Sequence, residues 1–213
     1  MNRSLPRRLW VTFSAYFIGC YASLFNRLKV KGGENLPADG GTMIAANHIS
    51  AYETIFLPWA LLKSRPLQMV WAPAKAELFN NRLVGALLRS WGAFPVKRGR
   101  DVRAGRLLEE LLRRDKVMLY PEGTRSRNGR LGRGNRGVGK LIYTVRPVVI
   151  PTGIIGLDKW TFPGLGQKGT IVFGAPVDFS DLFAREDNKE THQLIVDRLM
   201  AGIAELIDQP SPD

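Results

Sequence analysis

The sequence is poor in cysteine and histidine, the residues that form cross-links and that titrate near neutral pH. It has one cysteine, Cys20, and two histidines, His48 and His192, among 213 residues. A single cysteine excludes an internal disulfide framework, which fits a protein on the cytoplasmic face of a membrane. Acid–base chemistry by histidine is therefore restricted to two positions.

Long uncharged runs are also scarce, and the exception lies near the N-terminus. Leu9–Phe25 carries no charge, and its length of seventeen residues is at the lower limit for crossing a bilayer. Apolar residues recur there at helical spacing and basic residues flank the run, so we expect a helix lying in an anionic membrane interface. The alternatives are a signal peptide without an Ala-x-Ala site, a lipoprotein signal ending at Cys20, and a helix that covers the domain's own core. We assign residues 1–28 to this N-terminal amphipathic, membrane-associated segment and residues 29–213 to one further domain.

Acidic residues are outnumbered, and the imbalance is local. The chain has 31 Lys and Arg against 19 Asp and Glu, and the stretch 97–146 alone holds fifteen basic residues against five acidic ones. Such a segment suits phosphate groups, anionic lipid or an acidic protein partner. Nucleic acid is a rival partner, but the Arg- and Gly-rich run 125–140 lacks interleaved aromatic residues to stack bases, so we expect none.

Short apolar runs alternate with helical segments beyond residue 40. Alternation of this kind is typical of an α/β domain with a mostly parallel central sheet flanked by helices. The predicted strands are Thr42–Ala46, Gln68–Trp71, Ala93–Val96, Val117–Tyr120, Pro147–Pro151 and Thr170–Phe173. The predicted helices are Tyr52–Leu62, Arg82–Trp91, Val102–Arg113, Gly137–Tyr143 and Lys189–Ile207.

His48 stands between the first of these strands and the first of these helices. Ser50-x-x-Glu53 has the pattern of a capping box, which predicts that Ser50 caps the helix and that Glu53 is its third residue. Glu53 would then hold the His48 imidazole in one tautomer, so that its far nitrogen is available as a base. The alternative is that Glu53 only caps the helix and His48 only packs, while His192 is expected at the surface.

Three further strand ends carry polar groups. Lys75 follows one strand, Arg98 follows the next, and Glu122 and Arg125 follow a third on a loop that turns at Gly123. Because the carboxyl ends of parallel strands share one edge of a sheet, we expect these groups near His48. The alternative for the Glu122 loop is a surface turn with an exposed ion pair of little energetic value.

These stretches resemble the lysophospholipid acyltransferases, in particular the bacterial 1-acylglycerol-3-phosphate acyltransferases. Four motifs carry the resemblance, in order, between about residues 29 and 177. They are Asn47-His48-x-x-x-x-Glu53, Gly92 to Arg98, Tyr120-Pro-Glu-Gly-Thr-Arg-Ser126, and the apolar run Val148–Pro151. The chain has Tyr120 where the family has Phe and Glu53 where the family has Asp.

The resemblance implies an α/β glycerol-phosphate acyltransferase fold and a transfer reaction. His48 would accept the proton of the acceptor's hydroxyl, with Glu53 as its partner, and no metal or bound cofactor is implied. The implied substrate-binding residues are Lys75, Arg98, Glu122, Gly123, Thr124 and Arg125, of which the cations would hold the phosphate and Glu122 would orient the glycerol. The acceptor would be a lysophospholipid, the co-substrate acyl-CoA or acyl–acyl carrier protein, and the location the cytoplasmic face of the inner membrane, peripheral or monotopic.

The expected product is phosphatidate, made from 1-acyl-glycerol-3-phosphate. Because Glu53 departs from the family's Asp, acylation of another lysophospholipid, a glycolipid or an ornithine lipid is the first alternative. A basic phospholipid- or nucleic-acid-binding protein without catalysis is the second alternative. A thioesterase-like hydrolase that uses the same base on water is the third.

Overall fold

A computed structural model describes residues 3–97 and 101–212. Its strands are β1 (Arg27–Lys31), β2 (Thr42–Ala46), β3 (Val70–Lys75), β4 (Ala93–Val96), β5 (Lys116–Leu119), β6 (Val148–Ile155) and β7 (Lys168–Phe173). Its helices are α1 (Leu5–Cys20), α2 (Glu53–Ser64), α3 (Arg82–Ser90), α4 (Val102–Leu112), α5 (Arg136–Val145), the short α6 (Ser180–Phe183) and α7 (Lys189–Leu206).

The seven strands form one sheet in the order β1-β7-β6-β2-β5-β3-β4. Every neighbouring pair is parallel except β6 and β7, which are antiparallel. The predicted α/β fold with a mostly parallel central sheet is thus confirmed. The edge strand β1 was not predicted, because only Leu28 of its side chains is buried and its basic residues face outward.

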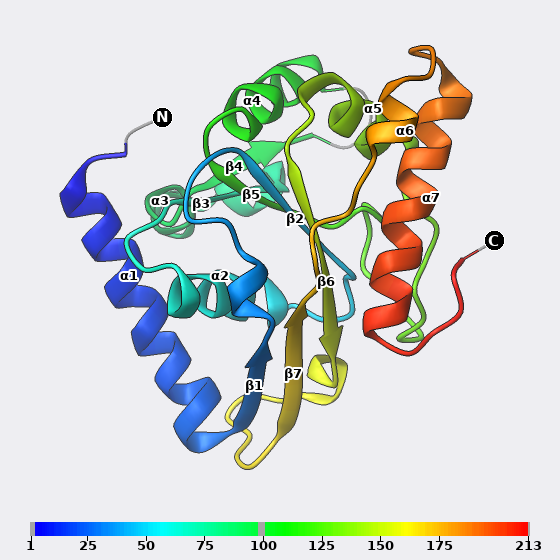
Figure 1. The fold of residues 1–213 in the computed structure, drawn as a ribbon. Helices are drawn as coiled ribbons and strands as arrows, with labels where there is room; N and C mark the ends of the chain where they lie inside the picture. The colour runs from blue at the N-terminus through cyan, green and yellow to red at the C-terminus, as the bar shows by residue number, and fades with distance from the viewer. Residues whose placement is uncertain (1–2, 98–100, 213) are drawn as a thin grey trace.

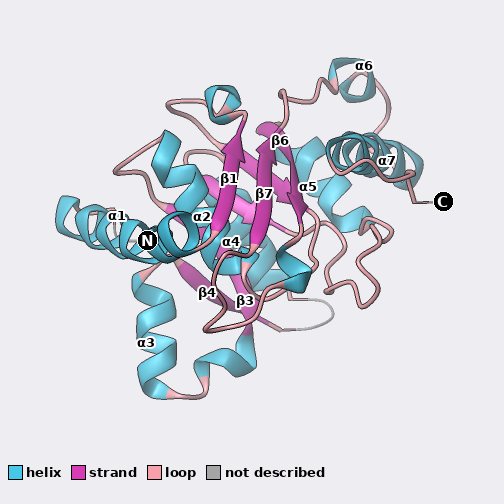
Figure 2. Ribbon diagram, turned by 90° about the horizontal axis from the view of Figure 1, so that it is seen from below, coloured by secondary structure: helices cyan, strands magenta, loops and turns pink. Residues whose placement is uncertain are grey.

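The direction of each crossover decides which face of the sheet its helix covers. The connection through α2 runs from β2 toward the β4 edge, whereas those through α4 and α5 run the opposite way. Since such crossovers are right-handed, α2 lies on one face and α4 and α5 lie on the other. In Figure 1, α1 lies outside α2 on the left, and α7 lies beside α5 on the right. Figure 2 shows the same layers from below.

Two strands extend beyond their predicted ends, in both cases past a proline. β3 leaves β5 after Trp71 and continues to Lys75 beside β4 alone, so Pro73 interrupts no ladder between two neighbours. β6 continues past Pro151 to Ile155, because its pairing with β7 begins only at Thr152. Prolines of this kind end strands only when both sides are paired, which depends on the tertiary structure.

The N-terminal helix α1 packs along α2 with one face. Val11 and Ala15 are buried, and a side chain at Gly19 would collide with the Trp59 ring, so glycine permits the close approach of the two helices. After Cys20 the chain continues as one π-helical turn, Tyr21–Phe25, and enters β1. Helix α1 therefore covers part of the core and leaves its opposite face exposed. The boundary at residue 28 stays a prediction.

None of the described helices has the length and apolar character that would be needed to cross a membrane.

Candidate active site

The site lies at the carboxyl ends of four neighbouring parallel strands. β2, β5, β3 and β4 are adjacent in the sheet, so the residues that follow them share one edge. His48 follows β2, Glu122 follows β5 and Lys75 ends β3. Arg98, the predicted residue beyond β4, lies outside the described residues. The sheet order thus brings His48, Lys75 and Glu122 to one edge.

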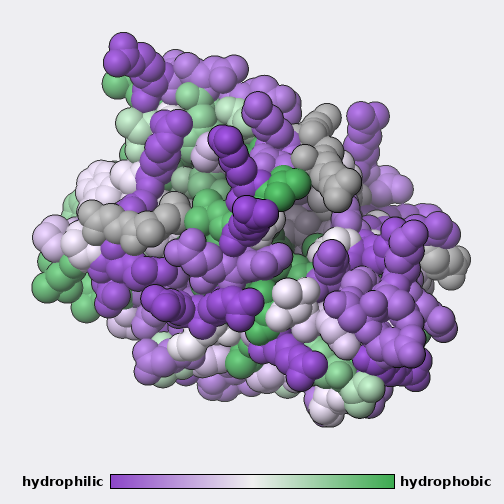
Figure 3. All heavy atoms as spheres, turned by 90° about the horizontal axis from the view of Figure 1, so that it is seen from above, coloured by the Kyte–Doolittle hydropathy of each residue, from purple (hydrophilic) through white to green (hydrophobic). Residues whose placement is uncertain are grey.

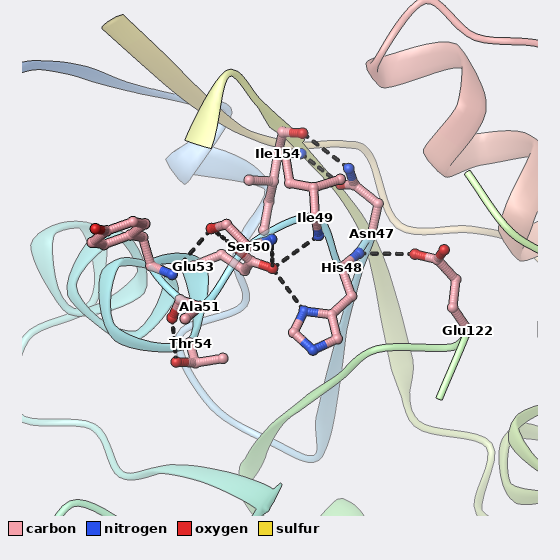
Figure 4. Close-up of polar contacts among 10 residues, drawn as sticks. Asn47, His48, Ile49, Ser50, Ala51, Glu53, Thr54, Glu122 and Ile154 are labelled. Carbon is pink, nitrogen blue, oxygen red and sulfur yellow. Dashed lines mark hydrogen bonds and ion pairs between the residues drawn. The ribbon is translucent and has the colours of Figure 1, made fainter. Parts of the chain in front are cut away.

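His48 and Glu53 form a close pair. The Nδ1 atom of His48 lies 2.7 Å from Oε1 of Glu53, and Figure 4 shows the carboxylate facing the imidazole. Because an ionised carboxylate only accepts hydrogen bonds, the imidazole carries its proton on Nδ1. Within the described part of the chain no residue hydrogen-bonds to Nε2, and the side chain is 16% exposed. The lone pair of Nε2 is therefore available to accept a proton.

Glu53 is fully buried and its carboxylate is saturated with donors. Besides His48, Oε1 accepts from the backbone N–H of Ile49 at 2.9 Å and of Ser50 at 2.8 Å, and Oε2 accepts from the Ser50 hydroxyl. Burial raises the pKa of Glu53, but the hydrogen bonds from His48 and Ser50 outweigh burial and hold the pKa below its usual value. Glu53 is thus a carboxylate at neutral pH.

The predicted capping box is only half formed. Glu53 does accept from the Ser50 N–H, as the box requires. The Ser50 hydroxyl, however, accepts from the N–H of Tyr52 at 3.0 Å, and the helix begins at Glu53 with Tyr52 as its first flanking residue. The prediction that Glu53 is the third helical residue is therefore wrong. The longer Glu side chain reaches back over a loop, which keeps His48 outside the helix.

Glu122 accepts hydrogen bonds from the backbone of two separate segments, one after β2 and one further along its own loop. Its Oε1 accepts from the backbone N–H of His48 at 2.8 Å, and its Oε2 accepts from Gly132 N at 2.9 Å. The Ser126 N–H also donates to the His48 carbonyl at 2.7 Å. The loop after β5 therefore fixes the backbone of His48, and the predicted role of Glu122 in orienting glycerol stays a prediction.

Tyr120 stacks on the imidazole of His48. The ring centroids lie 4.2 Å apart and the planes differ by 15°, so one face of the imidazole is covered. The Tyr120 hydroxyl is buried without a hydrogen-bond partner among the described residues. Burial raises its pKa well above the usual value, with the charge of Glu53 acting in the same direction and Arg125 opposing it. The phenol consequently stays neutral.

Asn47 connects β2 to β6. Its amide nitrogen donates to the Ile154 carbonyl at 2.9 Å, and its oxygen accepts from the Ile154 N–H at 2.7 Å. Asn47 is itself buried. The side chain thus substitutes for a ladder pair just where β2 ends and His48 begins.

The remaining predicted substrate-binding residues are exposed to solvent. Lys75 is exposed and lies 3.6 Å from the Glu77 carboxylate. Gly123 has φ +70°, which explains glycine at this turn, and Thr124 and Arg125 are exposed beyond it. No contact brings Lys75 to His48 in the described part of the structure. Substrate binding by these residues stays a prediction.

An open, arginine-rich pocket lies beside Glu122. It has a volume of about 510 Å³ and is lined by Glu122, Thr124, Ser126, Arg127, Asn128, Arg130, Leu131, Gly132 and Arg133. Arg127, Arg130 and Arg133 were not predicted as site residues, although the excess of arginine over 125–140 was the signal that pointed to them. Three guanidinium groups around one hollow suit an anionic ligand.

The second histidine is not at the surface, contrary to the sequence interpretation. His192 is buried, and its Nε2 lies 2.7 Å from the Asp187 carboxylate near the start of α7. The His192–Asp187 pair lies at the start of α7 and contributes to the packing of that helix. In the described part of the chain no three His, Cys, Asp or Glu side chains are grouped so that they could hold a metal ion.

Comparison with known proteins shows what the chain is similar to. A family model described as "Acyltransferase" matches residues 27–155. The chain is 29% identical over 197 residues to the 1-acyl-sn-glycerol-3-phosphate acyltransferase of Bacillus subtilis (strain 168), covering 91% of this chain and 95% of that protein. It is 27% identical over 157 residues to a chloroplastic 1-acyl-sn-glycerol-3-phosphate acyltransferase of Arabidopsis thaliana, but spans only 40% of that protein.

A solved structure shares the fold. The 1-acyl-sn-glycerophosphate acyltransferase PlsC from Thermotoga maritima superposes with a TM-score of 0.70 at 22% identity, over 93% of this chain and 79% of that one. This likeness supports the α/β architecture described above.

Proposed function

The chain belongs to the acyltransferase family, and from this premise we propose that it transfers a fatty acyl group from an acyl thioester to the free sn-2 hydroxyl of 1-acyl-glycerol-3-phosphate, making phosphatidate. The names of the relatives support this acceptor. The donor is acyl-CoA or acyl–acyl carrier protein, and the reaction requires no bound cofactor.

The observation that carries the proposal is the pairing of His48 with the buried Glu53. A carboxylate on Nδ1 fixes the tautomer and leaves Nε2 as a base, at the carboxyl edge of the sheet. Glu53 also stabilises the imidazolium that forms when His48 accepts a proton. Tyr120 and the loop after β5 hold the ring and its backbone in place.

In the proposed mechanism, His48 first accepts a proton from the acceptor and later returns it to the leaving thiolate. Nε2 of His48 accepts the proton of the acceptor's hydroxyl as that oxygen attacks the thioester carbonyl carbon, and a C–O bond forms. When the tetrahedral intermediate collapses, the C–S bond breaks and the thiolate takes the proton from the imidazolium. A general base in this role contributes about 10²- to 10⁴-fold to the rate.

The acceptor's phosphate requires cations near this edge. Lys75, Arg98 and Arg125 hold it in the proposed complex, and Arg127, Arg130 and Arg133 provide a second basic lining in the pocket that Glu122 shares. In the proposed location, α1 lies in the membrane interface and the enzyme is on the cytoplasmic face of the cell membrane. The basic flanks and exposed aromatic face of α1 support this location.

The test is thiol release from palmitoyl-CoA by purified protein in detergent, with and without lysophosphatidate. Acceptor-dependent release is expected. His48→Ala should lower it by at least about 100-fold while leaving the circular dichroism spectrum nearly unchanged. Because Glu53 loses one hydrogen-bond donor, the free energy of unfolding should fall by about 1.5–3 kcal/mol. His192→Ala is the matched control, since that histidine is also paired with a carboxylate at 2.7 Å. Its turnover should stay at the wild-type rate.

Each alternative has its own outcome in this assay. Release without acceptor would indicate a hydrolase, and release only with another lysolipid would change the acceptor. Normal turnover by His48→Ala would show that His48 is not the general base. Salt-sensitive lipid binding without any release from CoA or carrier-protein thioesters would favour a non-catalytic binding protein.

A further inference from the structure

Helix α3 exposes the side chains that a surface helix normally buries. Leu83 is 83% exposed and Val84 and Leu87 are exposed beside it, while only Gly85 of the helix is buried. A helix on a globular domain usually turns its apolar stripe toward the core. In α3 this stripe has no partner in the described chain.

Helix α1 carries a second exposed apolar stripe next to it. Leu9, Trp10, Phe13 and Phe17 are exposed, with Phe13 at 67% and Phe17 at 74%. The opposite face of α1 packs on α2, so the stripe faces away from the domain. Contiguous exposed apolar surface of this extent is typical of an interaction site.

Polar contacts join the two helices at one point. The Trp10 indole N–H donates to the Ser90 hydroxyl at 3.0 Å, and the Arg7 guanidinium donates to the carbonyls of Ser90, at 3.1 Å, and Arg89. These bonds satisfy carbonyls at the end of α3 and fix it against α1. Both ribbon views place the helices on the same side of the molecule (Figures 1 and 2).

We propose that these helices form one docking surface for a lipid bilayer that contains anionic phospholipid. The α1–α3 surface consists of Leu9, Trp10, Phe13, Phe17, Leu83, Val84 and Leu87. This inference rests on the proposed membrane location and adds α3, which the sequence did not mark as a membrane element. It does not depend on acyl transfer.

Charge identifies the partner. Neither Leu5–Cys20 nor Arg82–Ser90 contains an acidic residue, whereas α1 carries Arg7 and Arg8 and α3 carries Arg82 and Arg89. Arg89 lies over the Phe79 ring at 5.0 Å, on the side of α3 that also carries the buried Gly85. An apolar surface on two helices that carry basic and no acidic side chains fits anionic head groups. A second copy of this surface would bring like charges together.

The rest of the surface is consistent with docking on this side. Hydrophilic residues cover most of the face seen in Figure 3, and the larger hydrophobic area lies on the side where Figure 1 places α1 and α3.

Docking through α3 has a consequence for the substrate. Helix α3 lies in the connection between β3 and β4, the connection that begins at Lys75. A bilayer bound to α3 therefore lies near the β3–β4 end of the active edge. A lysolipid can then approach the edge from the membrane in which it resides.

The test uses cysteine labelling, for which the chain offers its own reference. Cys20 is exposed on α1, so the wild-type protein labelled there with an environment-sensitive dye reports on that helix. Leu83→Cys in a Cys20→Ser background reports on α3, and Ala201→Cys on the exposed side of α7 is the control. With vesicles of phosphatidylcholine and phosphatidylglycerol, we expect a blue shift at positions 20 and 83 and none at 201.

The outcomes separate α3 docking from the proposed location. A shift at 20 without a shift at 83 would overturn docking by α3 and leave docking by α1. No shift at either position would overturn membrane docking altogether, while thiol release would still test the acyl transfer. Shifts without vesicles, together with a dimer in gel filtration, would assign the surface to a second copy and overturn the proposal.

Affinity gives an independent measurement. The double variant Leu83→Ser with Leu87→Ser should lower vesicle binding about 10- to 100-fold in sedimentation assays. The matched control, Val102→Ser with Val148→Ser, removes exposed apolar side chains elsewhere and should bind as the wild type does. Equal binding by both double variants would overturn the role of α3.

Discussion

The most discriminating perturbation is Glu53→Asp, which gives this chain the residue that the lysophospholipid acyltransferases have at this position. The change shortens the side chain by one methylene, so the carboxylate withdraws by about 1.5 Å. Oε1 now receives hydrogen bonds at 2.7 Å from His48, 2.9 Å from Ile49 and 2.8 Å from Ser50. These contacts would stretch beyond about 4 Å, outside the hydrogen-bond range.

The expected loss of stability follows from the number of hydrogen-bond donors to Glu53. Hydrogen bonds to a charged group contribute about 1.5–3 kcal/mol each, and a buried donor without a partner costs about 1–3 kcal/mol. A small shift of the α2 start can restore some of the bonds, so we expect the free energy of unfolding to fall by about 2–4 kcal/mol. If the bond to His48 is among those lost, kcat/KM should fall about 10- to 150-fold.

Urea denaturation measures the first quantity and acceptor-dependent thiol release the second. Glu53→Gln is the companion variant, because it keeps the reach of the side chain, removes its charge and replaces one acceptor oxygen by an NH2 donor. It should lose less stability than Glu53→Asp but should still lose activity. Glu205→Asp makes the same chemical change at an exposed position of α7 and should behave as the wild type does.

An aspartate variant as stable and as active as the wild type would refute this reasoning. It would mean that the start of α2 adapts at no cost and that the geometry around Glu53 does not require glutamate. The difference from the family would then have no bearing on the mechanism.

Three further predictions concern the surroundings of the pair. Because hydrogen bonds hold the pKa of Glu53 below its unfolded value of about 4.3, the stabilisation is present above that pH and is lost as pH falls through the lower folded value. Urea titrations between about pH 6 and pH 3 should therefore show a steeper loss for the wild type than for Glu53→Gln, and parallel curves would contradict the assignment. Tyr120→Phe removes a buried hydroxyl without a partner and keeps the stacked ring, so the free energy of unfolding should rise by about 1 kcal/mol while thiol release is retained. A less stable variant would show that the hydroxyl has a partner that was missed. Asn47→Ala leaves the N–H and C=O of Ile154 unpaired and should cost about 2–4 kcal/mol in urea denaturation, whereas a loss under about 0.5 kcal/mol would show that water replaces the amide.

Much of the sheet could be predicted because its strands are buried on both faces. Such strands appear in the sequence as short apolar runs between turn residues, and β2, which is buried throughout, matches its predicted bounds. The edge strand β4 also matches its predicted bounds, although only Phe94 of its side chains is buried. β1 has only one buried side chain and was not predicted. β3 and β6 were predicted, but both continue past a proline, beyond their predicted ends at Trp71 and Pro151. The residues at the strand ends were recognisable because their types and spacing are local.

By itself the sequence determined the order of strands and helices from β2 to β7, the residue types at the strand ends, and that His48 precedes a helix containing Glu53. Only the tertiary structure decided the partners of Glu122 and Asn47. Each bonds to backbone 74 or 107 residues away, a distance that no local pattern encodes. It also decided that α3 turns its apolar stripe outward beside α1, because a periodic stripe has the same sequence whether it faces the core or a membrane.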